Sequence, residues 1–288
     1  MNGSQVGLLI VILVFFVLIE FAIDKAQNFG ATAGDNSLDM LGFGLLAALT
    51  QPLIFWIVKL AGLALAPQWL GALADWPLYA KVGLLLVFDD MVQYWWHRAS
   101  HSPLLWPLHR AHHSAHYMSA RIIYRNNFFY YLMMPAIWFS GVLVYLGLSS
   151  VYMVYIIVKL AVITGAHSAW RWDEPLYKVR WLSPLTWLLE RTISTPSTHW
   201  AHHALTNDDG IGYYIGNFGN LLFFWDVLFG TAHITRRYPA AVGLKDDRLF
   251  GKEPWYVELF YPLVWSRRRH SALTPGGGPY DDSRADRL

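Results

Sequence analysis

Nine of the twelve histidines lie in three short clusters whose spacing suits metal ligation. The clusters are His97 with His101, then His109, His112 and His113 with His116 just beyond them, and finally His199, His202 and His203. His167 stands alone between the second and third clusters, and only His233 and His270 lie outside the pattern. Because residues three and four positions apart share one face of a helix, each cluster could direct two or three imidazoles toward one point.

The number of imidazoles predicts a site for two metal ions. A neutral imidazole suits zinc, copper, iron and nickel, and one zinc ion takes three or four protein ligands. Nine or ten histidines therefore exceed what one ion can hold, whereas two ions with four or five imidazoles each would use them all. We treat His116 as a reserve ligand, and His233 and His270 as ordinary surface residues.

Other familiar metal motifs are absent from the sequence. No histidine is followed by glutamate as in zinc proteases, and no His-x-Glu motif of zinc deaminases occurs. No glutamate lies three residues before a histidine, as it does in ferritin-type di-iron bundles. The clusters contain no carboxylate for the usual mononuclear iron oxygenase site. The absence of cysteine also excludes disulfides, iron–sulfur clusters and thiolate zinc sites.

The composition is that of a membrane protein. Of the 288 residues, 55% are hydrophobic and only 15% are charged, against about 25% charged in typical soluble domains. The fifteen tryptophans and sixteen tyrosines fit a protein with two lipid–water interfaces, where amphipathic rings collect. The net charge of +2 is too small to indicate a nucleic-acid partner.

Long apolar runs predict an all-α, multi-pass transmembrane protein with about five spans, since a spanning helix needs ~20 apolar residues. The runs are 6–23, 38–66, 78–96, 128–146 and 150–167. Gln51, Pro52 and Lys59 suggest that the second run is one kinked helix. The first run could instead be a signal peptide, because residues 31–33 (Ala-Thr-Ala) resemble a cleavage site, but no Lys or Arg precedes it.

The distribution of Lys and Arg predicts the orientation in the membrane. The short loops at 67–77 and 147–149 contain neither residue, whereas 97–126 and 168–288 contain many. By the positive-inside rule the basic segments are cytoplasmic, with the N-terminus outside and the C-terminus inside. The clustered histidines then lie at the cytoplasmic surface, and we expect short helices over 168–260 to form a cytoplasmic cap that carries the dimetal site.

Charged residues beside the first two clusters could support the site. Asp89 and Asp90 lie near the end of an apolar helix, where a charge is costly and often functional. We expect Asp90 to accept a hydrogen bond from a ligating imidazole or to pair with Arg98, and Asp89 to reach interfacial water. Arg98 and Arg110 could hold lipid phosphate or dock an acidic electron donor, or they could anchor the chain at the membrane surface.

The motifs resemble those of the fatty acid hydroxylase superfamily, which includes sterol desaturases. They run from Asp90-x3-Tyr94-x2-His97-Arg98-x2-His101 through Trp106-x2-His109-x2-His112-His113-Ser114 to His199-x2-His202-His203, and the closing segment runs from Asn217 to Thr231. The resemblance covers roughly residues 85–232. Ala204 departs from the pattern, because many relatives have glycine there, and so does the segment 121–127 (RIIYRNN). This segment approaches the substrate in relatives, so the substrate could be unusual.

The resemblance implies a membrane-embedded, non-haem di-iron oxidoreductase, a monooxygenase that uses dioxygen as co-substrate to hydroxylate or desaturate a C–H bond of a lipid. The implied ligands of the two iron ions are His97, His101, His109, His112, His113, His167, His199, His202 and His203. We add Asp90, Tyr94 and Arg98 as candidate catalytic residues. We expect a separate electron-donor protein, either cytochrome b5-like or a ferredoxin with its reductase. The implied location is a bacterial cytoplasmic membrane, with the active site on the cytoplasmic side.

The same reasoning divides the chain into four segments. Residues 1–84 form N-terminal transmembrane helices, 85–232 the catalytic domain, 233–273 a cytoplasmic C-terminal segment and 274–288 a disordered tail. Aromatic residues could line the route of the lipid or could serve as interfacial anchors. These residues are Tyr94, Trp95, Trp96, Phe128, Phe129, Tyr130 and Tyr131.

Two other functions fit a histidine-rich membrane protein. A metal transporter would use the imidazoles to pass ions through the membrane, but its polar residues should then be spread through the spans rather than gathered at one face. A dinuclear metal hydrolase that acts on lipids usually has bridging carboxylates, which the histidine clusters lack.

Overall fold

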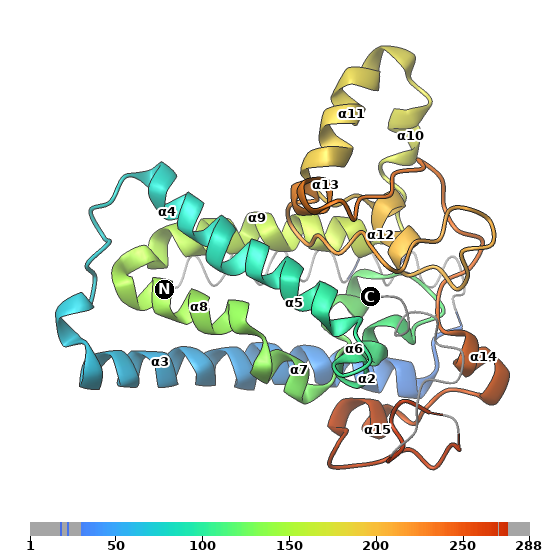
Figure 1. Cartoon of the computed structure of the whole chain (residues 1–288), viewed down its shortest axis with the longest axis horizontal. Coiled ribbons are helices and arrows are strands. Elements are labelled where there is room, and N and C mark those ends of the chain that lie inside the picture. Colours follow the sequence, from blue (N-terminus) through green and yellow to red (C-terminus); the bar gives the residue numbers. More distant parts are fainter. Residues whose placement is uncertain (1–17, 19–21, 23–29, 270, 276–288) are drawn as a thin grey trace.

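The computed structural model describes residues 18, 22, 30–269 and 271–275. Over these residues the regular elements are helices, and the only β-structure is a pair of isolated bridges. The helices form an elongated bundle with a cap at one end (Figure 1). The all-α prediction is therefore confirmed. The apolar run 6–23 lies outside the described residues except for Leu18 and Ala22, as do His270 and most of the tail.

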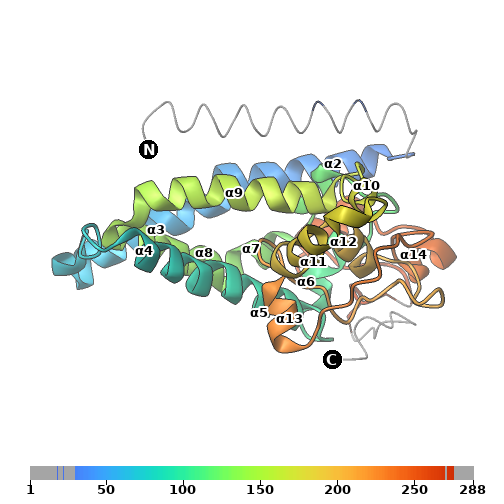
Figure 2. The same cartoon turned by 90° about the horizontal axis from the view of Figure 1, so that it is seen from above.

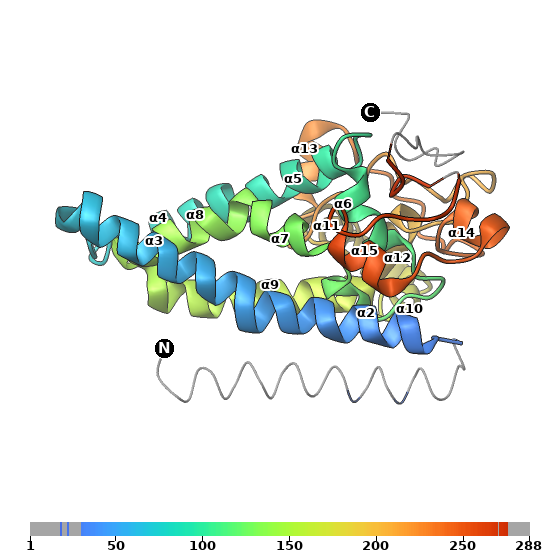
Figure 3. The same ribbon diagram turned by 90° about the horizontal axis from the view of Figure 1, so that it is seen from below.

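The first rod of the bundle is a continuous helix made of α2 (Ala33–Gly44), η1 (Leu45–Thr50) and α3 (Gln51–Leu65). It runs the full length of the bundle (Figure 3). A capping box starts it, because Thr32 and Asp35 each accept a hydrogen bond from the other's backbone N–H. Pro52 lacks an N–H and would crowd a regular α-helix, and the wide π-helical turn of η1 lies immediately before it. The irregular turn therefore lies where the sequence predicts a kink.

The second rod consists of α4 (Leu78–Leu85), η3 (Leu86–Met91) and α5 (Val92–Ser100), joined to the first by a loop that contains η2 (Pro67–Trp69). It begins directly after Pro77. A proline lacks the backbone N–H that a helix interior requires, so it suits the start of a helix. The π-helical turn η3 contains Asp89 and Asp90, and both side chains are buried. The rod thus carries two acidic residues into the bundle and ends beside the first histidine cluster.

The other two rods form a helical hairpin. The first arm comprises α7 (Phe128–Met133), α8 (Pro135–Leu143) and η5 (Val144–Leu148), and the second arm is α9 (Ser149–His167). Gly147 has a φ of 109°, a conformation that side-chain-bearing residues rarely adopt, and the chain reverses there (Figure 1). A Cβ atom on Gly147 would also lie 2.9 Å from the backbone nitrogen of Ala74. The apolar runs 128–146 and 150–167 are therefore the two arms of one hairpin.

Two helical stretches, Ala33–Leu65 and Pro135–His167, are long and apolar enough to cross a membrane. The second stretch contains both arms of the hairpin. Large apolar side chains such as Trp56, Leu60 and Val154 face outward from these rods, as suits contact with lipid tails. The count of five spans and the orientation in the membrane stay predictions.

The cap gathers short helices at the end of the bundle opposite the α3–α4 loop (Figure 2). They are α6 (Trp106–His113), η4 (Ala120–Tyr124), α10 (Glu174–Tyr177), η6 (Arg180–Leu182), α11 (Ser183–Thr192), α12 (Pro196–His202), α13 (Phe224–Phe229), α14 (Lys245–Phe250) and α15 (Trp255–Phe260). This agrees with the short helices predicted over 168–260.

A buried arginine joins the C-terminal helices to α6. Arg110 is only 1% exposed, and its guanidinium donates to Asp246 (2.8 Å), Asp247 (2.5 Å) and Glu258 (2.5 Å). The expectation that Arg110 faces lipid phosphate, an electron donor or the membrane surface is therefore wrong. Three carboxylates from α14 and α15 surround it instead, and sequence spacing does not reveal contacts between residues so far apart in the chain.

Replacement of Arg110 should destabilise the cap. In Arg110→Met the buried carboxylates lose their most enclosed cation, and breaking such a buried pair costs about 3 kcal/mol or more. We expect a clearly lower melting temperature in detergent solution. The matched control is Arg248→Met, which makes the same change at an exposed position of α14. Equal melting temperatures for the two variants would contradict the structural role of Arg110.

Candidate metal centre

Nine buried imidazoles converge in two adjacent groups. The first group contains His97, His101, His109, His113 and His202, and the second contains His112, His167, His199 and His203. Within each group the candidate ligand nitrogens lie within 4.8 Å of one another. The structure thus brings together all nine residues that the sequence pattern singled out, in one group of five and one of four.

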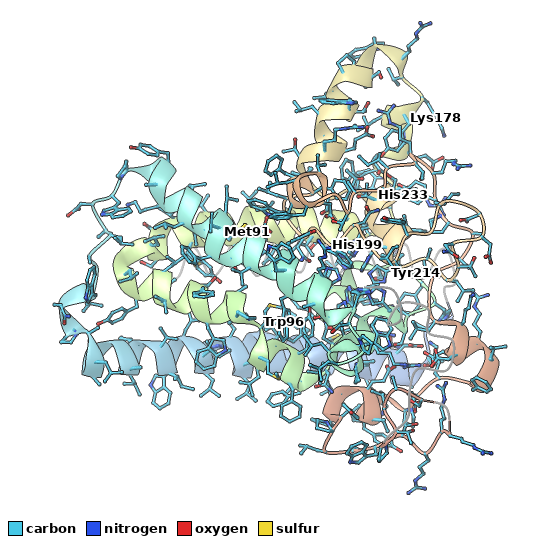
Figure 4. All side chains as sticks on the ribbon, viewed as in Figure 1. Met91, Trp96, Lys178, His199, Tyr214 and His233 are labelled. Carbon is cyan, nitrogen blue, oxygen red and sulfur yellow. The ribbon has the colours of Figure 1, made fainter. Side chains whose placement is uncertain are left out.

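Two short helices of the cap lie between the groups and contribute to both. On α6, His109 and His113 are four residues apart and share the first group, whereas His112 turns toward the second. On α12, His199 is in the second group and His202 is in the first. Figure 4 shows His199 among many side-chain nitrogen atoms at the junction of bundle and cap. His203 directly follows α12, and the other ligands, His97, His101 and His167, come from the ends of α5 and α9.

Backbone carbonyls fix the ring orientation of a pair in the first group. His97 donates from Nδ1 to the carbonyl of Phe218, and His202 donates from Nδ1 to the carbonyl of Gly216, both at 2.8 Å. With the proton on Nδ1, the Nε2 atom of a neutral ring carries only a lone pair. The two Nε2 atoms face each other at 3.1 Å, a contact that no hydrogen bond can then stabilise.

The second group contains a pair of the same kind. His112 donates from Nδ1 to the carbonyl of Ile122 (3.0 Å), and His167 donates to the carbonyl of Ile163 (2.9 Å). Their Nε2 atoms are 3.3 Å apart. Two imidazole ligands of one ion, each bound at about 2.0–2.1 Å, would have their ligating nitrogens about 2.8–3.4 Å apart at right or tetrahedral angles. Each group therefore fits a metal cation that the facing lone pairs would bind.

Burial also selects the protonation state that binds metal. Removal from solvent lowers the pKa of His112, His199, His202 and His203 well below the usual value for an imidazole, and the neighbouring imidazoles lower it further. These rings are neutral at physiological pH. A neutral imidazole is the form that binds a metal ion, so the site needs no proton release from these residues.

Asn126 supports the first group, a role that sequence reasoning missed. Its Oδ1 atom accepts a hydrogen bond from Nδ1 of His109 (2.9 Å), while its Nδ2 atom donates to the hydroxyl of Tyr131 (3.0 Å). The preceding residue, Arg125, is buried and pairs with Asp35 and Asp39 of α2. The unusual segment 121–127 was the available signal, because it lies directly after the second cluster.

Asp226 shapes the loop that supplies the carbonyl acceptor for His97. Its carboxylate accepts hydrogen bonds from the backbone of Phe218 (2.9 Å) and Gly219 (2.6 Å) and from the hydroxyl of Thr231 (2.6 Å). Burial raises the pKa of Asp226 to about 6, although these three hydrogen bonds favour the charged form. The loop belongs to the closing segment 217–231, but the sequence did not indicate that one carboxylate organises it.

Asp90 supports the same loop and does not contact an imidazole or Arg98. Its carboxylate accepts from the backbone N–H groups of Leu221 (3.2 Å) and Leu222 (3.1 Å) and from the indole of Trp225 (2.8 Å). The expected contact is therefore wrong. Asp90 lies seven residues, about two helical turns, before His97 on the same rod. Its carboxylate therefore contacts the loop at Leu221 and Leu222, whereas the imidazole of His97 contacts it at Phe218.

Tyr94 and Arg98 face away from the cavity beside the imidazoles. The Tyr94 hydroxyl lies 2.8 Å from the hydroxyl of Thr231, and Arg98 donates to Tyr94 (3.3 Å) and lies over the ring of Trp95. Neither Tyr94 nor Arg98 lines the cavity. The predicted catalytic role would thus have to be a positioning role, through the closing segment.

A cavity of about 840 Å³ extends from the imidazoles into the bundle. His97, His109, His112 and His167 line one end of it, and Ser149 and Ser150 line the other. Ile123, Tyr124 and Asn126 of the unusual segment face it, as the resemblance implied. Of the aromatic residues considered for the lipid route, Tyr130 and Tyr131 line the cavity, whereas Tyr94, Trp95, Trp96, Phe128 and Phe129 do not.

The two other histidines among the described residues, His116 and His233, lie outside both groups. The Nδ1 atom of His116 is 2.9 Å from the ammonium of Lys252, so this reserve ligand is turned away from the site. His233 stacks on the ring of Tyr213.

Comparison with known proteins shows that the chain belongs to a known family. The profile of the family described as Fatty acid hydroxylase matches residues 82–231, slightly more than half of the chain. Alkylglycerol monooxygenase from Danio rerio is 31% identical over 182 residues, which make up 62% of this chain and 36% of the relative. The chain thus spans only about a third of that relative's length. No solved structure matches.

Loss of one first-group imidazole should release metal. We expect His202→Ala to hold less than the two metal ions per chain expected for the parent protein, because the remaining ligands lose the partner of His97. The measurement is metal content by elemental mass spectrometry on the purified protein. His233→Ala, which removes an imidazole outside both groups, should keep the parent content. Full metal content in His202→Ala would refute the ligand assignment.

Loss of the Asn126 acceptor should weaken metal retention without removing a ligand. Partners that orient ligating imidazoles typically contribute about 10–100-fold in metal affinity. We expect Asn126→Ala to lose metal to a chelator in that range and Asn126→Asp, which keeps an acceptor for His109, to retain more of it. If the two variants lose metal equally, the hydrogen bond to His109 is not what supports the site.

Proposed function

Because the chain belongs to the fatty acid hydroxylase family, we propose that it is a membrane-bound di-iron oxygenase that hydroxylates or desaturates an aliphatic C–H bond of a lipid. The observation that carries the proposal is the pair of buried imidazole groups at one end of a large cavity in the bundle. Alkylglycerol monooxygenase acts, by its name, on an alkyl lipid, which supports a lipid substrate here.

The nine imidazoles would hold one iron ion in each group. Iron is among the metals that imidazole ligands suit, and the groups contain no carboxylate. When bound, the two ions would supply the activation of dioxygen, with electrons from a separate cytochrome b5-like protein or a ferredoxin and its reductase.

The chain itself would bind and orient the lipid and exclude water. The cavity walls are mostly apolar, so burial of an alkyl chain there is favourable. Four imidazoles line one end of the cavity, which would bring a C–H bond of the bound chain next to the ions. Tyr130 and Tyr131 from α7 line the cavity, and the ring of Tyr130 stacks on His109. Selection of one carbon would follow from how far the chain enters.

The proposed topology places the cap on the cytoplasmic side of a bacterial cytoplasmic membrane, with about five spans once the run 6–23 is included. Residues 85–232 would be the catalytic domain. The segment 233–273 would be a structural addition to it, since Arg110 binds α14 and α15 to the helix that carries three of the ligands.

Lipid analysis tests the proposal directly. We expect membranes from cells that produce the protein to contain a lipid that has gained one oxygen or lost two hydrogens, and cells that produce His202→Ala to lack it. The purified protein should contain two irons per chain and consume dioxygen with a lipid extract and a reductant. Tightly bound zinc with oxygen-independent lipid cleavage would refute the proposal in favour of a hydrolase. Metal flux through liposomes without lipid oxidation would refute it in favour of a transporter.

A further inference from the structure

A buried ion pair lies in the wall of the cavity, away from the imidazoles. Asp89 of η3 and Lys159 of α9 are salt-bridged, and they are 6% and 3% exposed. Asp89 also accepts hydrogen bonds from the hydroxyls of Ser140 (2.9 Å) and Tyr155 (2.6 Å). The expectation that Asp89 reaches interfacial water is therefore wrong. An ion pair within an apolar bundle is costly, and such groups usually serve a function.

The ammonium of Lys159 has more donors than the described residues satisfy. An ammonium has three N–H donors, whereas among the described residues Lys159 donates to Asp89 and has the ring of Tyr155 5.7 Å away. Burial of donors without acceptors is unfavourable. Because Lys159 lines the cavity, an oxygen atom inside the cavity would be within its reach.

The charge balance of the cavity indicates what kind of oxygen this is. Lys159 is the one lysine or arginine among the described lining residues, and Asp89 is the one carboxylate. The pair is neutral as a whole, and no second lysine or arginine among the described lining residues could neutralise a phosphate. An uncharged hydroxyl, ether or carbonyl oxygen can accept from Lys159 without adding charge to the bundle.

Both residues lie at the same spacing from the metal centre. Asp89 is eight residues before His97 on the second rod, and Lys159 is eight residues before His167 on α9. Eight residues of helix correspond to about 12 Å. His97 and His167 also line the cavity, so the same space connects the ion pair to both imidazole groups.

We propose that Lys159, held in place by Asp89, donates a hydrogen bond to an uncharged oxygen of the lipid substrate and thereby sets the oxidised carbon about 12 Å from that oxygen. The inference rests on the proposed function and narrows its substrate to lipids that carry a hydroxyl, ether or carbonyl group. The imidazole groups would hold the ions that supply the oxidation, and the ion pair would decide which carbon of the lipid lies beside them.

The test compares two probes, hexadecanol and hexadecane, which differ by one oxygen. Equilibrium binding to the purified protein should favour the alcohol by about tenfold or more, the typical effect of a hydrogen bond to a charged group. The variant Asp89→Asn/Lys159→Met removes both charges together, which avoids an unpaired buried charge. It should lose the preference, while Lys59→Met, at an exposed position of α3, should keep it. Unchanged metal content verifies that each variant is folded.

Two results would overturn the inference: equal binding of the two probes by the parent protein, as expected if only water occupies the polar site, or a preference that survives in the double variant. A second measurement needs no variant. In straight-chain alcohols of increasing length, oxidation should stay at a constant distance from the oxygen, and oxidation counted from the methyl end would also overturn it. Alcohol preference without any oxidation would refute the proposed function and leave the binding site standing.

Discussion

The structure depends on the burial of nine imidazoles, eight of which place their Nε2 atom within 3.3 Å of the Nε2 atom of another ring. This arrangement is unfavourable unless cations sit among the rings and unless acceptors hold the Nδ1 protons on the outside. The acceptors are chiefly backbone carbonyls, at Phe218, Gly216, Ile122 and Ile163. The cap segments that contain Phe218, Gly216 and Ile122 therefore serve to place these carbonyls beside the Nδ1 atoms of the imidazoles.

Buried carboxylates and arginines hold the segments that carry the acceptors. Asp226 accepts hydrogen bonds from the backbone of Phe218 and Gly219, and Asp90 accepts them from Leu221 and Leu222. The loop that carries the carbonyl orienting His97 is therefore held at Phe218 and just beyond it. Arg125, tied to α2, precedes Asn126, which orients His109. These charged groups touch no candidate ligand themselves. They position the imidazoles through the main chain. This explains why they are buried close to the metal centre although they are not ligands.

The ligands could be predicted from the sequence, whereas their supports could not. Spacings of three and four residues place imidazoles on one helical face, so each cluster can be recognised within a short stretch of the sequence. The apolar runs likewise predicted the rods of the bundle. The partners of Arg110 and Asp90 lie more than 130 residues away in the chain, and no local pattern encodes such contacts. Both residues were therefore assigned to the wrong neighbours, although their proximity to the site was correctly expected.

Two of the rods extend from the bundle to the metal centre and connect the ion pair with the imidazoles. The second rod carries Asp89 and His97, and α9 carries Lys159 and His167, each with the polar residue deeper in the bundle and the imidazole at its end. A helix does not stretch, so the separation along each rod is fixed by residue count. The salt bridge between Asp89 and Lys159 joins the two rods at one level. At the other level α12 lies against both rods, because His202 contacts His97 and His199 contacts His167. The cavity between these levels therefore has a defined length, which is what a protein needs to select one carbon of a flexible chain.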